Sequence, residues 1–97
     1  MAASFPYLIH ELASAHHAKN VLQMSQRVDI PYTTLWRWER GMTRQYHYEL
    51  IARLCDCYGL SEEMVWGRIH QDEALRRRGK RVPVPDLSGR RRGPTGT

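Results

Sequence analysis

The 97-residue chain has only two cysteines, Cys55 and Cys57. One residue separates them in a segment with a helical pattern, so their side chains point about 200° apart and a disulfide between them is not expected. A zinc site that joins them to His47 or His70 lacks the paired spacing typical of zinc ligands. We therefore expect reduced thiols, no metal site and no cofactor.

The chain also lacks a long apolar run. No stretch approaches the roughly 20 apolar residues that span a bilayer, and the first residues do not show the basic and then apolar pattern of a secretory signal. We expect a soluble, cytoplasmic protein with no membrane partner. The sequence has no Gly-rich phosphate loop, nucleophile motif or paired carboxylates, so catalysis is the least expected class of function.

The net charge of +5 is distributed unevenly along the chain. From Arg76 onward there are eight Lys and Arg side chains and one acidic residue, Asp86, whereas the preceding residues hold seven basic and nine acidic side chains. Beyond Gly79 the composition changes to Pro, Gly, Arg and Ser with few apolar residues. This change predicts a helical domain over residues 1–78 and a disordered basic tail over residues 79–97.

The apolar spacing of residues 1–78 predicts an all-α fold with five helices. Side chains suited to capping a helix N-terminus precede three of them, at Ser4, Asn20 and Ser61. We expect the fifth helix to end between Gln71 and Arg78. The apolar positions of four helices are Leu8, Leu12 and Ala15; Val21, Leu22, Met24 and Val28; Tyr48, Ile51, Leu54, Cys55 and Tyr58; and Met64, Val65 and Ile69.

Residues 20–41 have the pattern of a helix-turn-helix. The second helix is expected to end at Asp29, because Asp tolerates a turn backbone and Pro31 disfavours helical geometry in the residue before it. A third helix then spans residues 31–40. Two helices joined by only three or four residues cross steeply, and the small Ser25 suits a close approach of their backbones.

The third helix is the predicted DNA-reading element. Leu35 and Trp38 are expected to point into the core, and the opposite surface is formed by Tyr32, Thr33, Trp36 and Arg37. Arg donates two parallel hydrogen bonds to guanine, and Thr and Tyr bond bases or contact the thymine methyl group. The alternative is an ordinary surface on which Trp36 folds back onto the core. Asn20 at the start of the second helix, with Arg40 and Arg44 after the third, suits contact with phosphates on both sides.

Residues 20–41, NVLQMSQRVDIPYTTLWRWERG, resemble the lambda-repressor-like, Cro-type helix-turn-helix family. The later run LIARLCDCYGLSEEMV is similar to the family's fourth and fifth helices, so the resemblance covers about residues 5–70. It departs from the family pattern at Ser25, Asp29 and Pro31. The resemblance implies a supporting role for Glu39, base contacts by Tyr32, Thr33, Trp36 and Arg37, and phosphate contacts by Asn20, Arg44 and the backbone amide of Val21.

The resemblance also implies a homodimer formed through the fifth helix or the segment after it. The candidate interface residues are Met64, Trp66 and Ile69, and the alternative for Trp66 is a place in the core. We expect a transcriptional regulator, by default a repressor, that reads an inverted repeat in duplex DNA. The alternatives are an antitoxin-like protein that binds a toxin partner and regulates its own synthesis, and an RNA-binding protein that acts through the Arg-rich tail. The tail either contacts nucleic acid or only aids solubility.

Overall fold

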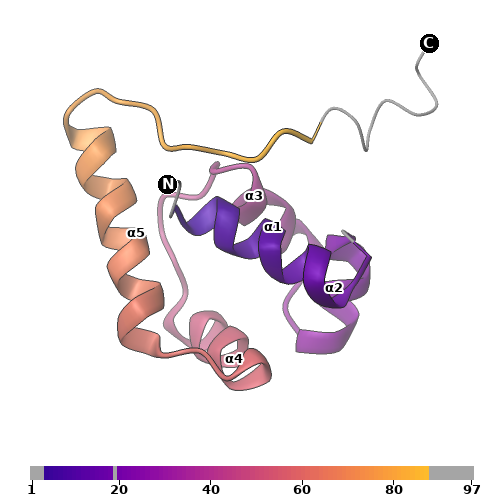
Figure 1. Ribbon diagram of the computed structural model, residues 1–97. Coiled ribbons are helices and arrows are strands. Elements are labelled where there is room, and N and C mark those ends of the chain that lie inside the picture. Colours follow the sequence, from indigo (N-terminus) through magenta and orange to yellow (C-terminus); the bar gives the residue numbers. More distant parts are fainter. Residues whose placement is uncertain (1–3, 19, 88–97) are drawn as a thin grey trace, which may run out of the picture.

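The computed structural model describes residues 4–18 and 20–87. In this part of the chain all regular secondary structure is helical, as predicted (Figure 1). None of the described helices is both long and apolar enough to cross a membrane. The helices are α1 (Phe5–His16), α2 (Val21–Val28), α3 (Tyr32–Glu39), α4 (Tyr48–Tyr58) and α5 (Glu62–Arg77).

The capping residues predicted from the sequence are confirmed. Ser4, Asn20 and Ser61 each accept a hydrogen bond from a backbone amide in the first turn of α1, α2 and α5, respectively. These bonds satisfy amides that have no partner inside their own helix. Asp29 adopts a left-handed backbone with φ of 61° at the end of α2, and Pro31 immediately precedes α3. The turn between the two helices is therefore as short as predicted.

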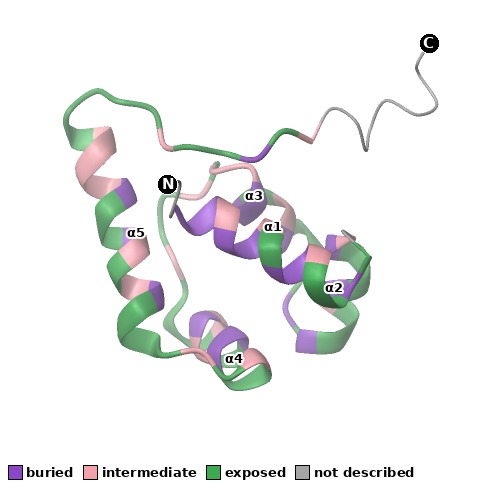
Figure 2. Ribbon diagram, in the orientation of Figure 1, coloured by how far each residue is buried: buried purple, intermediate pink, exposed green. Residues whose placement is uncertain are grey.

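All five helices contribute buried side chains to one core, and α1 and α3 contact each other there. Helix α1 contacts α2, α3 and α5, while α2 packs against both α3 and α4. The Phe5 and Trp38 rings meet edge to face with their centroids 5.2 Å apart, an arrangement that aromatic pairs prefer. On α5 the buried positions lie along the side that faces α1 (Figure 2). The central helices thus hold α3 firmly along one side.

Four of the predicted apolar positions are exposed: Ala15, Leu22, Tyr48 and Met64. The buried stripe of α1 follows four-residue steps through Phe5, Ile9 and Ala13, which places Ala15 about 200° away from Ala13. Leu22 and Tyr48 lie at the starts of α2 and α4, and the buried faces of those helices follow other positions. The spacing identified the helices but not the exact edge of each apolar face.

The structure differs from the predicted disorder over residues 79–87. Residues 80–87, here called the C-terminal strap, run back from the end of α5 past the C-terminal end of α3 (Figure 1). The Ser4 hydroxyl donates to the backbone carbonyl of Pro83 at 2.7 Å, and Pro85 is buried. A segment beside a formed domain needs only a few such contacts, and proline lowers the entropy that ordering removes. Residues 88–97, the rest of the predicted tail, lie outside the described residues.

Candidate nucleic-acid interface

Helix α3 presents two different sides. Leu35 and Trp38 are 0% and 1% exposed, which confirms that they point into the core. At about 100° per residue, the predicted base-reading positions fall within an arc of about 140° opposite this buried pair. Tyr32, Thr33 and Arg37 are exposed on that arc, and Trp36 is half-buried. The core does not cover the predicted reading surface.

Trp36 owes part of its burial to Arg40, the residue that follows the last residue of α3. The Arg40 guanidinium stacks over the Trp36 ring, 4.2 Å from its centroid. This cation–π contact keeps the indole against α3 and fixes the direction of the guanidinium. Arg40 Nη1 also lies 3.9 Å from Glu39 Oε1, and the Arg40 side chain is 24% exposed. Of the predicted phosphate ligands, Arg40 is thus the most constrained by the protein itself.

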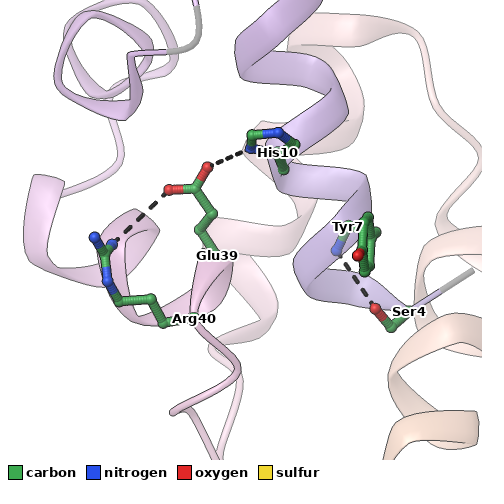
Figure 3. Close-up of polar contacts among 5 residues, drawn as sticks. All are labelled: Ser4, Tyr7, His10, Glu39 and Arg40. Atoms are coloured by element: carbon green, nitrogen blue, oxygen red, sulfur yellow. Dashed lines mark hydrogen bonds and ion pairs between the residues drawn. The ribbon is translucent and has the colours of Figure 1, made fainter. Parts of the chain in front are cut away.

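Glu39 has the supporting place that the family resemblance implied. Its side chain is completely buried, and Oε2 lies 2.9 Å from Nδ1 of His10 on α1 (Figure 3). A carboxylate accepts hydrogen bonds, so His10 Nδ1 is the donor in this contact. A buried carboxylate needs such partners, because removing its charge from water is costly. The pair fastens the last turn of α3 to α1.

The predicted phosphate contacts lie at the start of α2 and after the end of α3. Asn20 is half-buried, and its side-chain oxygen accepts from the Leu22 amide at 2.8 Å. The Val21 side chain is buried, while its amide belongs to the first turn of α2, the end of the helix that attracts anions. Arg44 is exposed in the loop between α3 and α4.

Arg53 on α4 is a structural residue that the sequence did not indicate. Its Nη1 donates to the Asp29 carbonyl at 2.8 Å and lies 3.8 Å from the Asp29 carboxylate. The contact braces the turn between α2 and α3, whose geometry sets the angle between those helices. The residues are 24 positions apart, so no local pattern points to this pair.

The predicted dimer residues do not share one surface. Ile69 is 1% exposed and belongs to the core, so it is not available to a second copy of the chain. The prediction placed it at an interface because helical spacing does not tell which neighbour covers an apolar face. Trp66 is half-buried and packs against the core, with its ring centroid 6.2 Å from that of His70. Met64 remains exposed.

Asp72 is a buried carboxyl group on α5 that the sequence did not reveal. It is 2% exposed and accepts a hydrogen bond from the Phe5 amide at 3.0 Å. Burial raises the pKa of Asp72, whereas the Phe5 hydrogen bond and the nearby Arg76 and Arg68 oppose that change. The contact joins α5 to the start of α1.

A second cluster lies away from α3, around a cavity of about 310 Å³ lined by His16, His17, Arg27, Cys57 and Tyr58. His17 Nε2 and the Tyr58 hydroxyl are hydrogen-bonded. Burial lowers the pKa of His17 and raises the pKa of Tyr58 to about 12, because it disfavours the charged form of each group. Across the described ranges, no three His, Cys, Asp or Glu side chains gather as a metal-binding set. Cys55 and Cys57 are both free thiols.

Comparison of the chain with protein-family models, with curated proteins and with solved structures finds no match. The resemblance to Cro-type proteins therefore stays a prediction that depends on the residues of this chain.

Proposed function

We propose that this protein is a sequence-specific regulator that binds duplex DNA and reads the major groove with α3. One observation carries the proposal: Leu35 and Trp38 hold α3 in the core while the side chains on its opposite arc face outward. An α-helix fits the B-DNA major groove, which is about 12 Å wide. A helix fixed along one side and open on the other suits this role.

The exposed residues supply base-reading chemistry. Arg37 is positioned to donate two hydrogen bonds to guanine O6 and N7, and Thr33 to bond a base or contact a thymine methyl group. Tyr32 reads through its ring edge or hydroxyl. Trp36 is half-buried in this surface, and the Arg40 guanidinium stacks on its ring. This combination suits a site that contains both G·C and A·T pairs.

Flanking groups fix the register of the helix on the duplex. Asn20 and the Val21 amide at the start of α2 contact one phosphate, and Arg40 and Arg44 after α3 contact others. Phosphate contacts position a protein without reading sequence. They complement the reading surface on α3.

The regulator acts by occupying a promoter as a repressor in the cytoplasm, and it binds as a homodimer. Two units that are about one helical turn of DNA apart read an inverted repeat and supply the affinity that a single small unit lacks. Met64 and Trp66 on α5 are the candidate dimer contacts. Ile69 is excluded because it is buried in the core.

Selection of bound sequences from a random duplex pool, with a random single-stranded RNA pool in parallel, tests the proposal. We expect one short inverted repeat to be enriched from the duplex pool, and its symmetry reports the dimer. Recovery of unrelated duplexes would contradict sequence reading. Preferential enrichment of RNA would assign the protein to the RNA-binding class instead.

A further inference from the structure

A shallow, open groove of about 440 Å³ lies where the loop after α3 meets the C-terminal strap. Five cationic side chains line it, and none of its described lining residues is acidic. They come from three separate parts of the chain: Arg40 and Arg44 after α3, Arg76 on α5, and Lys80 and Arg81 on the strap.

We propose that this groove binds the sugar-phosphate backbone of the same duplex that α3 reads, with Lys80 and Arg81 joining Arg40 and Arg44 as phosphate ligands. The inference rests on the proposed function and extends it to the strap. The strap would add a backbone contact beyond the helix-turn-helix and lengthen the DNA segment that one protein unit covers.

The strap is built into the groove wall. The Ser4 hydroxyl holds the Pro83 carbonyl, and Pro85 is buried beyond it. Val84 lies so close to Gly41 that a Cβ added at Gly41 would meet the Val84 side chain at 2.9 Å. Gly41 directly follows the Arg40 cap of α3. Lys80 and Arg81 are therefore held beside the C-terminal end of the reading helix.

The five cations have two different roles. The Arg76 guanidinium donates to the Gly41 carbonyl at 2.9 Å, and the Arg40 guanidinium stacks on Trp36. These two contacts shape the wall, and Arg40, with its side chain 24% exposed, also keeps its proposed phosphate contact. Arg44, Lys80 and Arg81 are exposed, so their charged groups face solvent at the rim. Exposed cations gathered from separate segments suit a ligand that carries several negative charges in a row.

A duplex backbone fits these charges better than a single small anion. B-DNA carries a phosphate about every 3.4 Å along each strand, and each one neutralised by Lys or Arg releases counterions. The groove adjoins the end of α3, so a duplex with α3 in its major groove would present its flanking phosphates here. Five positive charges exceed what one phosphate ion would neutralise.

The test compares two double variants of the full chain that remove the same charge. Lys80→Ala with Arg81→Ala removes two proposed ligands. Arg77→Ala with Arg78→Ala is the matched control, because both residues are exposed and neither lines the groove. Affinity for the selected duplex, and for a shuffled duplex of the same composition, is measured by fluorescence anisotropy between 50 and 200 mM salt. Circular dichroism melts check that both variants are folded.

For the strap variant we expect the slope of log affinity against log salt to fall by about 1.8 on both duplexes, at about 0.9 per lost phosphate contact. The fall in affinity between 50 and 200 mM salt should therefore be about 12-fold smaller for the strap variant than for the unmodified chain. The control variant should keep nearly the slope of the unmodified chain. The ratio of the two affinities, selected over shuffled, should stay unchanged because backbone contacts read no sequence.

If the strap variant and the control variant have the same slope of log affinity against log salt, the groove assignment is overturned. The basic residues would then act only through the total positive charge of the protein. A lost preference for the selected duplex in the strap variant would overturn the backbone assignment and indicate base contact. A polyglutamate peptide that displaces the duplex from the unmodified chain but not from the strap variant would assign the groove to acidic proteins. Failure of the proposed function is a separate result, because the unmodified chain would then show no preference between the two duplexes.

Discussion

Glu39 and His10 join α3 to α1 through a partly buried hydrogen bond of 2.9 Å (Figure 3). Glu39 is completely buried, whereas the His10 side chain is 26% exposed. The bond lies in the last turn of α3, immediately before Arg40 and the loop that carries Arg44. The orientation of α3 and the stability of the domain thus depend on the same contact.

Substitution of His10 by Ala should lower the free energy of unfolding by about 1–3 kcal/mol, because the Glu39 carboxylate would lose a partner in a buried place. Urea unfolding at neutral pH measures this effect. Glu49→Gln, at an exposed position on α4, serves as the control and should stay within about 0.5 kcal/mol of the unmodified chain. A His10→Ala variant as stable as the control would show that the bond is unimportant.

Asp72 should make stability depend on pH. Because burial raises its pKa above the ordinary 3.8, the folded chain holds the Asp72 proton at pH values where the unfolded chain has lost it. This contribution to stability is complete below the unfolded pKa and is lost as pH rises through the raised folded pKa. Asp72→Asn keeps an acceptor for the Phe5 amide and removes the titration.

The gain in unfolding free energy of Asp72→Asn over the unmodified chain should therefore grow as pH is raised from 3 to 7. Chemical unfolding at several pH values measures it. Glu63→Gln, at an exposed position on the same helix, controls for a general change in charge. A difference that does not vary with pH would contradict the direction of the Asp72 pKa change.

Two glycines should respond in opposite ways to substitution by Ala. Gly41 has φ of +69°, and an added Cβ would lie 2.9 Å from Val84 Cγ1, so Gly41→Ala should destabilise the protein by about 1 kcal/mol or more. Gly67 lies within α5 with nothing near an added Cβ, so Gly67→Ala should stabilise it by about 0.5–1 kcal/mol. Thermal melts of both variants check this. Equal shifts would argue against the close packing of the strap on Gly41.

Local signals account for most of what the sequence predicted. The caps at Ser4, Asn20 and Ser61 and the inward positions Leu35 and Trp38 depend on neighbours within a turn or two of helix. Such neighbours are visible in the sequence because helical spacing fixes them. The helices and the outward face of α3 could therefore be predicted.

Contacts between distant residues could not be predicted in this way. The Asp72 carboxylate and the Phe5 amide are 67 positions apart, and the Ser4 hydroxyl and the Pro83 carbonyl are 79 apart. Composition alone predicted disorder for the strap, because it cannot show that the folded domain offers Pro85 a buried place. The basic groove depends on this strap, so it was also missed.

The roles of Arg37 and Arg44 differ in a way that binding experiments can separate. Arg44→Ala should weaken binding to all duplexes alike and lower the salt slope by about one, because it removes a phosphate contact. An unchanged slope would remove Arg44 from the phosphate contacts. Arg44→Ala is also the matched control for Arg37→Ala, since both remove one exposed guanidinium near α3.

The most direct test of DNA reading by α3 is the affinity of Arg37→Ala for the selected duplex and for its single-base-pair variants. We expect a cost of about 1–3 kcal/mol on the selected duplex, together with loss of preference at one base pair in each half-site. Equal weakening on every duplex, with all base preferences retained, would contradict the reading of DNA sequence by this face of α3.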